Sequence, residues 1–431
     1  MSRILIKQAE VLDSQGLICP ADIAIDQGKI VGIGNYEFWS ANKVIDGKDK
    51  LAIPGFINTH THAAMTLFRS YADDMLLMDW LENKIWPAED KLTPADVYWG
   101  TMLAIVEMIQ SGTTTFSDMY FHMDEVARAV EESGIRGVLA RGMAGVAPNG
   151  EQALKDSEDF FNNWNHKASG RITVMLGPHA PYTCPPAYLK KVVALADKLN
   201  APIHIHLSET QGEVADCLKE YGLSPIALME QVGILDHPVL AAHCVHVSDA
   251  DIALMKAHSV KVAHNPGSNM KLASGIAPVP KLLEQGIVVG LGTDGTASNN
   301  NLDMIEEMRL AALLHKTSSL DPLVIPAKQA VNMATEQGAK CLGLEKVIGT
   351  LKEGYEADVV LLDMHKPNWY PRHDRLSLLT YAASAGDVDT VIVQGKILMY
   401  KRQMTHLDVE RILFENQVRG LRLVQNSEKN S

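Results

Sequence analysis

The feature that most constrains the fold is a series of eight short apolar segments, rich in β-branched residues, that alternate with longer stretches of helical pattern. Such runs are typical of strands buried on both faces in a parallel sheet. They occupy residues 55–62, 113–118, 135–141, 172–179, 202–209, 239–246, 260–266 and 287–294. Eight βα units over about 300 residues match a (β/α)8 TIM barrel, and we predict this α/β fold.

The two ends of the chain have a different texture, with short strands separated by turns. The turn Gln27-Gly28-Lys29 near the N-terminus is repeated as Gln394-Gly395-Lys396 near the C-terminus. We therefore expect the two ends to form one small sheet domain together.

The predicted domain boundaries follow from this change of pattern. They are 1–54 for the first part of the sheet domain, 55–350 for the barrel, and 351–431 for the second part of the sheet domain with a terminal helix. The helical segment 407–426 is expected to pack on the outside of the barrel, and a polar tail follows it.

Composition restricts the class of partner. The formal net charge is −13, and hydrophobic residues make up 46% of the chain. An acidic chain lacks the clustered Lys and Arg that neutralise phosphates, so nucleic acid is not expected and a small-molecule ligand fits better. No run approaches the roughly 20 apolar residues of a membrane span, and no secretory leader is recognisable. We expect a cytoplasmic protein, with a homo-oligomer left open.

The five cysteines are scattered and contain no C-x-x-C pair. This argues against a disulfide framework or a thiolate zinc site.

Polar side chains recur at the ends of the predicted strands. In a TIM barrel the functional groups gather at the carboxyl ends of the strands. The residues at these ends are His60 and His62, His179, His206 with Glu209, His243, His264, and Asp294. Scattered core histidines would not be expected to favour that edge so often.

Four of these residues are candidate metal ligands. His60 and His62 are two apart on a strand, so both side chains point to the same face. With His206 and Asp294 they supply the N and O ligands that zinc accepts, and a position remains for water. Asp294 lies in Gly292-Thr293-Asp294-Gly295, where a turn or capping role is the alternative.

Glu209 and His243 are candidate acid/base residues. Glu209 follows His206 by three residues, so we expect it on the loop above the metal. Its alternative is a glutamate in the N-cap region of the next helix. His243 is either a second proton-handling group or a buried core imidazole. His204 is expected to line the barrel interior without touching the metal. The roles of His246 and His264 are left open.

These residues resemble those of the amidohydrolase superfamily. The match runs from Pro54 to His62, through His206-x-x-Glu209, to Gly292-Thr293-Asp294. The resemblance implies a distorted barrel with a β-sandwich built from the two termini. It also implies a single ion, because the fourth strand ends in Pro178-His179 where binuclear members have a modified lysine.

Within this superfamily, residues 62–74, 79–81 and 85–89 look like those of 5-methylthioadenosine/S-adenosylhomocysteine deaminases. The resemblance implies that Glu89 binds ribose hydroxyls, Arg141 meets the substrate's tail and His179 contacts the nucleoside. A solvated turn, an ordinary ion pair and a turn cap are the respective alternatives. Trp86 and Met65 are candidates for an apolar thioether pocket.

The implied reaction is hydrolytic deamination at purine C6 with one Zn²⁺ per chain, another divalent metal being the alternative. Glu209 would protonate N1, and His243 and Asp294 would orient and deprotonate the attacking water. One alternative is a guanine or 8-oxoguanine deaminase or a triazine-type hydrolase. Another is a catalytically silent barrel that serves as an assembly module, which predicts missing ligands.

Overall fold

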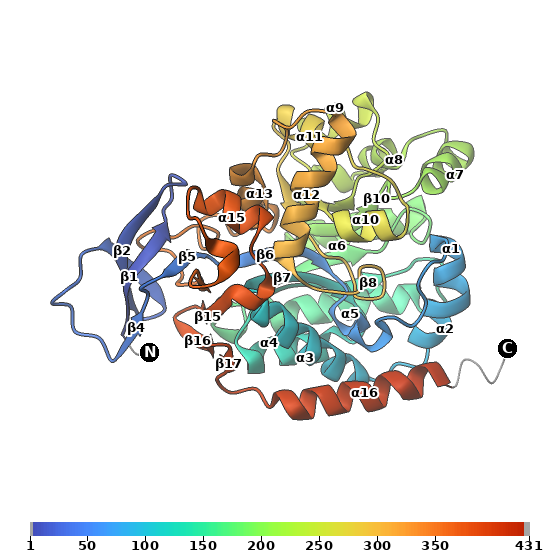
Figure 1. Cartoon of the computed structure of the whole chain (residues 1–431). Coiled ribbons are helices and arrows are strands. Elements are labelled where there is room, and N and C mark those ends of the chain that lie inside the picture. The colour runs from blue at the N-terminus through green and yellow to red at the C-terminus, as the bar shows by residue number, and fades with distance from the viewer. Residues whose placement is uncertain (1–2, 426–431) are drawn as a thin grey trace.

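A central barrel and a flanking sheet make up the molecule (Figure 1). The structure is a computed structural model, and it describes residues 3–425. The predicted polar tail lies outside the described residues. The eight parallel barrel strands are β6 (Phe56–Thr61), β7 (Thr113–Tyr120), β8 (Arg136–Met143), β9 (Ile172–Pro178), β10 (Ile203–Leu207), β11 (Val239–His243), β12 (Lys261–His264) and β13 (Val289–Leu291).

These strands pair in chain order, and the sheet nearly closes on itself between β13 and β6. The backbone N–H of Asp294 donates to the carbonyl of His60 at 3.0 Å, and the Thr59 hydroxyl donates to the carbonyl of Leu291 at 2.9 Å. The predicted barrel is therefore confirmed: six of its strands lie within the predicted apolar segments, and β7 and β8 each overlap one and extend two residues past its end.

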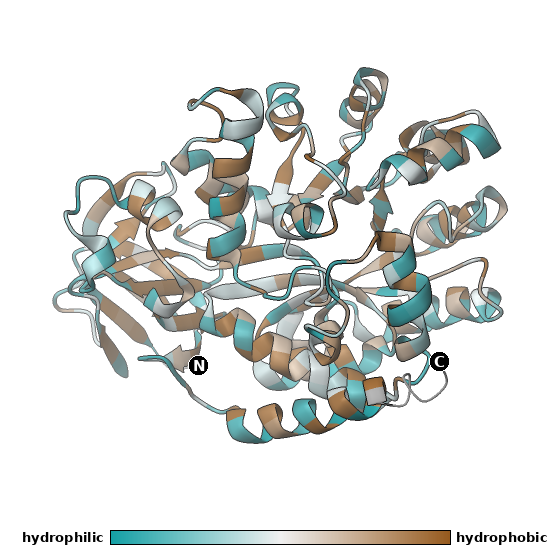
Figure 2. Ribbon diagram, turned by 45° about the vertical axis from the view of Figure 1, so that its right-hand side comes forward, coloured by the Kyte–Doolittle hydropathy of each residue, from teal (hydrophilic) through white to brown (hydrophobic). Residues whose placement is uncertain are grey.

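Helices cover the outside of the barrel, and Figure 2 shows mainly hydrophobic strands behind helices of mixed character. The longer helices are α3 (Pro94–Gln110), α4 (Met123–Ser133), α5 (Gly150–Trp164), α6 (Pro186–Leu199), α7 (Gln211–Tyr221), α8 (Pro225–Val232), α9 (Asp249–Ala257) and α12 (Met304–Ser319). The shorter ones are α1 (Leu77–Trp80), α2 (Trp86–Glu89), α10 (Pro266–Lys271), α11 (Val279–Glu284), α13 (Ala327–Met333), α14 (Glu336–Cys341) and α15 (Arg375–Tyr381). Among the described residues, none of these helices has the length and apolar character needed to cross a bilayer.

As predicted, the two ends of the chain form one sheet together, a mixed sheet with nine strands within residues 3–425. Its strands are β1 (Ile4–Leu12), β2 (Ile18–Asp26), β3 (Lys29–Gly34), β4 (Lys43–Asp46), β5 (Lys50–Pro54), β14 (Val359–Asp363), β15 (Val388–Val393), β16 (Lys396–Tyr400) and β17 (Gln403–Met404). The antiparallel pair of β5 and β14 joins the N-terminal and C-terminal parts. The exact domain boundaries at 54/55 and 350/351 stay predictions.

The repeated Gln-Gly turns connect two hairpins of this sheet. Gln27 and Gly28 have φ of 50° and 84°, and Gln394 and Gly395 have φ of 48° and 69°. Two consecutive positive φ values are the geometry of a type I′ turn, which suits the twist of a hairpin. A Cβ on Gly395 would lie 2.8 Å from the Cα of Gly28, so the two turns pack directly against each other.

The terminal helix α16 (Val409–Gln425) packs on the outside of the barrel against α3, as predicted (Figure 1). Asp96 contributes to this attachment. Its carboxylate accepts the Thr93 N–H in a capping box that begins α3. The same carboxylate is buried and pairs with Arg419 and Arg422 of α16. One side chain therefore both caps α3 and fixes the terminal helix.

Candidate active site

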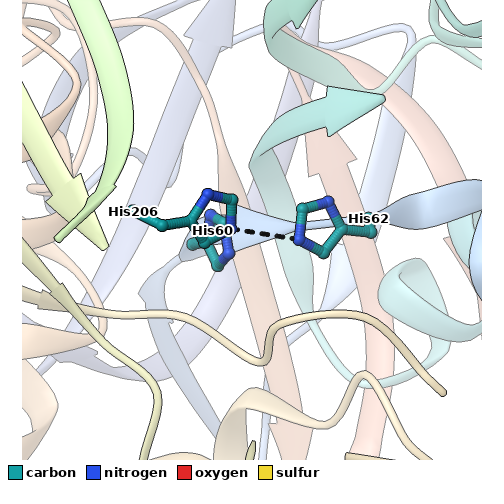
Figure 3. Close-up of side chains that lie close together, drawn as sticks. All are labelled: His60, His62 and His206. Atoms are coloured by element: carbon teal, nitrogen blue, oxygen red, sulfur yellow. Dashed lines mark hydrogen bonds between the residues drawn. The ribbon is translucent and has the colours of Figure 1, made fainter. Parts of the chain in front are cut away.

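The candidate residues converge at the carboxyl ends of the barrel strands. His60 lies in β6 and His62 directly follows it, while His206 lies in β10. His243 is the last residue of β11, and Asp294 follows β13. Figure 3 shows the imidazoles of His60, His62 and His206 pointing toward one another.

Side-chain nitrogen and oxygen atoms of these residues face one another at the barrel mouth. The Nε2 atoms of His62 and His206 are 3.3 Å apart. Oδ1 of Asp294 lies 3.4 Å from Nε2 of both His60 and His62. His60 Nε2 is buried and has no hydrogen-bond partner among residues 3–425. Lone pairs that converge in this way fit a bound cation, so the site has the donor set for a divalent metal ion.

Two of the histidines have their other ring nitrogen fixed by the backbone. His62 Nδ1 lies 2.7 Å from the carbonyl of Met119, and His206 Nδ1 lies 2.8 Å from the carbonyl of His179. A carbonyl only accepts, so both Nδ1 atoms carry the proton and both Nε2 atoms present a lone pair. Burial lowers the pKa of His206 well below its usual value, which keeps this imidazole in the neutral form that binds metals.

Asp294 is held by its own turn while it faces the histidines. Its Oδ1 accepts the Gly295 N–H at 2.8 Å, and its Oδ2 accepts the hydroxyl of Ser268 at 2.6 Å. Burial acts to raise the pKa of Asp294, but its close contacts with the histidines, His60 first and then His62 and His243, outweigh this and hold the pKa well below its usual range. The turn role and the role toward the histidines are therefore compatible.

The backbone is strained around these residues. Ser208, His243, Cys244 and Asp294 have φ between 47° and 72°, a region that side chains other than glycine rarely adopt. Such residues cluster at functional sites, where the surrounding packing holds them. Here they turn the chain sharply at the strand ends, so that the polar side chains stay at the barrel mouth.

Glu209 lies on the loop after β10, and its side chain is buried. Its Oε2 is 3.7 Å from His243 Nε2, and the Ser274 hydroxyl donates to its Oε1 at 3.4 Å. Burial raises the pKa of Glu209, which favours the protonated form of this carboxyl group.

Another pair of residues caps the helix that follows Glu209. Thr210 accepts the N–H of Glu213 at the start of α7. The Glu213 carboxylate accepts the N–H groups of Ser208 and Glu209, each at 2.8 Å. Thr210-x-x-Glu213 is a capping-box signature readable in the sequence, yet sequence reasoning missed Glu213 and its hold on the Glu209 backbone.

His243 is buried beside Glu209, with Nδ1 2.8 Å from the side-chain oxygen of Asn269. Because an amide oxygen accepts, His243 Nε2 is the nitrogen free to exchange a proton. Burial works to lower the pKa of His243, but the charges of Glu209 and Asp294 raise it above the usual value. Asn269 and Ser268 lie in α10, and no local pattern in the sequence pointed to them.

A cavity of about 1020 Å³ opens above the cluster. Its wall includes the three candidate substrate residues Glu89, Arg141 and His179, together with Met65 and Trp86. The structure therefore brings all three to one cavity with His62, His206, Glu209, His243 and Asp294.

Each substrate candidate has a fixed partner. The Tyr120 hydroxyl donates to Glu89 Oε1 at 2.6 Å, and Arg141 Nη2 donates to Asp156 at 3.1 Å. His179 Nδ1 lies 2.9 Å from the Thr183 hydroxyl, and burial lowers the pKa of His179 to about 3, so this ring is neutral. Tyr120 and Asp156 also line the cavity and were missed from the sequence.

The remaining histidines of interest lie outside the cluster. His264 Nε2 is 3.1 Å from His315 Nε2 in the core, and His246 Nε2 donates to the carbonyl of Ser274 at 2.6 Å. His204 is fully buried one step deeper than His206, as expected from its position.

Comparison with known proteins now identifies the family. The amidohydrolase family model matches residues 51–398. The chain belongs to the amidohydrolase family. It is 55% identical over 426 residues to the 5-methylthioadenosine/S-adenosylhomocysteine deaminase of Carboxydothermus hydrogenoformans, covering 98% of each chain.

Solved structures of similar architecture extend this comparison. An adenosine deaminase from Xanthomonas campestris with bound zinc is similar with a TM-score of 0.94 and 32% identity, covering 97% of this chain and 98% of that one. Atrazine chlorohydrolase from Arthrobacter aurescens TC1, complexed with zinc, is similar with a TM-score of 0.90 and 25% identity, covering 97% and 100%. Both the predicted fold and the predicted superfamily are therefore confirmed.

Proposed function

We propose that this amidohydrolase is a zinc-dependent deaminase that converts the adenine of 5-methylthioadenosine and S-adenosylhomocysteine to hypoxanthine and releases ammonia. The observation that carries this proposal is the 55% identity over nearly all of both chains with a deaminase of this substrate class. The candidate metal ligands and acid/base side chains that gather at and beside one cavity support it. The cytoplasmic location and the oligomeric state stay predictions.

Zinc would be held by His60, His62, His206 and Asp294, and when bound it supplies a Lewis acid that makes a water molecule nucleophilic near neutral pH. Zinc-bound relatives and the donor set support this choice of metal. The barrel mouth supplies neutral imidazoles and one carboxylate, a combination that zinc accepts readily.

The buried side chains at the metal site are proposed to carry out the proton transfers. Attack at C6 breaks the aromaticity of the purine, so N1 must gain a proton as the tetrahedral centre forms. Glu209 is the proposed donor, because burial raises its pKa and its carboxyl lines the cavity. His243, oriented by Asn269, and Asp294 are proposed to orient the attacking water and accept its proton. Proton delivery to the exocyclic nitrogen then lets ammonia leave.

The other cavity residues would hold the nucleoside. Glu89 would accept hydrogen bonds from the ribose hydroxyls, and neutral His179 would contact the nucleoside. Arg141 would meet the charged tail of S-adenosylhomocysteine. Met65 and Trp86 would pack against the thioether.

The direct test is to incubate zinc-loaded protein with methylthioadenosine, adenosylhomocysteine, adenosine, guanine and a chlorotriazine. Ultraviolet absorbance and ammonia release would be followed for each compound. Turnover of the aminopurine nucleosides supports the proposal. Turnover of guanine or the triazine alone would favour a guanine deaminase or a triazine-type hydrolase. No turnover of any compound would favour a non-catalytic barrel.

Arg141→Met is expected to discriminate between the two proposed substrates. S-adenosylhomocysteine has an α-carboxylate, whereas the methylthio group is uncharged. A hydrogen bond to a charged group contributes about 1.5–3 kcal/mol, so kcat/KM for S-adenosylhomocysteine should fall roughly 10- to 150-fold. Because the methylthio group has no charge for Arg141 to meet, kcat/KM for methylthioadenosine should change less than about threefold. Equal losses for the two substrates in steady-state assays would remove Arg141 from the tail site.

The acidic limb of the pH profile is expected to report Glu89. Burial raises its pKa to about 7, while the Tyr120 hydrogen bond opposes this. Only the carboxylate accepts two ribose hydrogen bonds, so kcat/KM should rise as the pH increases through about 7. Glu89→Gln should be less active and should lose this limb. Tyr120→Phe should move the limb to higher pH, and an unchanged profile in both variants would contradict the assignment.

A further inference from the structure

His60 differs from the other two histidines of the cluster in the partner of its second ring nitrogen. His60 Nδ1 lies 2.9 Å from Nε2 of His204. The two rings meet almost at right angles, with an interplanar angle of 81°, and both side chains are 0% exposed. Neither ring therefore has water as an alternative partner for this nitrogen.

When the partner of a ring nitrogen is another histidine, either ring can donate the proton, whereas a carbonyl partner can only accept it. Between two neutral imidazoles, either His60 Nδ1–H donates to His204 Nε2, or His204 Nε2–H donates to His60 Nδ1. In the second arrangement the proton of His60 sits on Nε2, next to Asp294 Oδ1 at 3.4 Å. That nitrogen then has no lone pair for a metal. Only the first arrangement lets His60 bind one.

The far side of His204 can accommodate the first arrangement. Its Nδ1 lies 3.4 Å from the hydroxyl oxygen of Ser117 in β7. When His204 Nε2 accepts from His60, His204 Nδ1 carries the proton and faces an oxygen that can accept it. The chain of groups from His60 through His204 to Ser117 is thus satisfied with the His60 Nε2 lone pair directed at Asp294 and the other ligands.

We propose that His204 is a positioning residue that holds His60 in its metal-binding tautomer. The proposal rests on the metal site described under Proposed function, and it gives a task to the one histidine of β10 that does not face the cavity. Since metal ligands generally need an outer partner of this kind, loss of the acceptor should weaken metal binding rather than abolish the fold.

The chain offers a matched pair of variants for the test. His204→Phe removes the acceptor but keeps an aromatic ring of similar size, and His204→Gln places an amide oxygen near the position of the lost Nε2. The control is His315→Phe, because His315 and His264 form a second buried imidazole pair, at 3.1 Å, away from the cluster. Thermal unfolding of the metal-free proteins measures any general damage.

The readout is the dissociation constant for zinc, measured by chelator competition with metal-free protein. We expect a 10- to 100-fold increase for His204→Phe. His204→Gln should recover most of the affinity, and His315→Phe should match the wild type. Equal zinc affinity in His204→Phe and His315→Phe would overturn the proposal. Because zinc binding is read without substrate, failure of the deaminase assignment would leave this result interpretable.

A second measurement stands even if His204→Phe does not fold. In zinc-loaded wild-type protein labelled with ¹⁵N-histidine, the nitrogen chemical shifts report which ring atom carries the proton. We expect protonated Nδ1 in both His60 and His204. A proton on His204 Nε2 would contradict the proposal directly.

Discussion

Glu209→Gln is expected to lower kcat for methylthioadenosine by about 10³-fold while leaving the zinc content unchanged. The amide keeps the size and the acceptor atom that meets Ser274, but it cannot store and deliver a proton. General acid/base groups contribute about 10²–10⁴-fold, and Glu209 is the proposed donor of the proton that N1 needs as the tetrahedral centre forms. Stopped assays of ammonia release and metal analysis of the same sample check both parts.

The control for this variant is Glu220→Gln, on the exposed face of α7. It makes the same chemical change in the helix that follows the Glu209 loop, so it should leave both kcat and zinc content near wild type. If Glu209→Gln lost zinc, Glu209 would belong to the metal site. If it kept full turnover, another group would supply the proton to N1.

The barrel could be predicted because parallel strands buried on both faces leave a strong sequence pattern. Each of the eight apolar segments coincides with or overlaps one strand, and the order of the strands in the sheet follows the chain. The candidate site followed from the same pattern, because a fold with a defined functional edge turns strand-end residues into neighbours. His60, Glu209 and Asp294 are far apart in the sequence and lie at the same barrel mouth for this reason.

The partners of these residues could not be predicted in the same way. Asn269 and Ser268 reach His243 and Asp294 from α10, a six-residue helix with no motif of its own. His204 was correctly placed in the barrel interior, yet its contact with His60 depends on the distance between β6 and β10 across the barrel. Contacts of this kind are set by tertiary packing, and a single sequence does not encode them locally.

Among the described residues, the geometry of the cluster admits two sets of metal ligands. Three-residue groups with suitable spacing are His60, His62 and His206, and also His60, His243 and Asp294. His206 Nδ1 is fixed by a backbone carbonyl that directs its Nε2 toward His62. His243 instead has its Nε2 3.7 Å from Glu209, a partner for proton transfer. These contacts support the proposal that His206 binds the metal and that His243 transfers a proton.

His206→Ala is accordingly expected to lose zinc and turnover together, whereas His243→Ala should keep zinc and lose turnover. Loss of a direct ligand should weaken zinc binding by more than the roughly 10- to 100-fold that loss of an outer partner costs. Removal of His243 should lower kcat by about 10²–10⁴-fold. Chelator competition and ammonia release, measured on both variants, separate the two roles. The opposite pattern, with zinc lost only in His243→Ala, would favour the second group and make His206 the residue that handles protons.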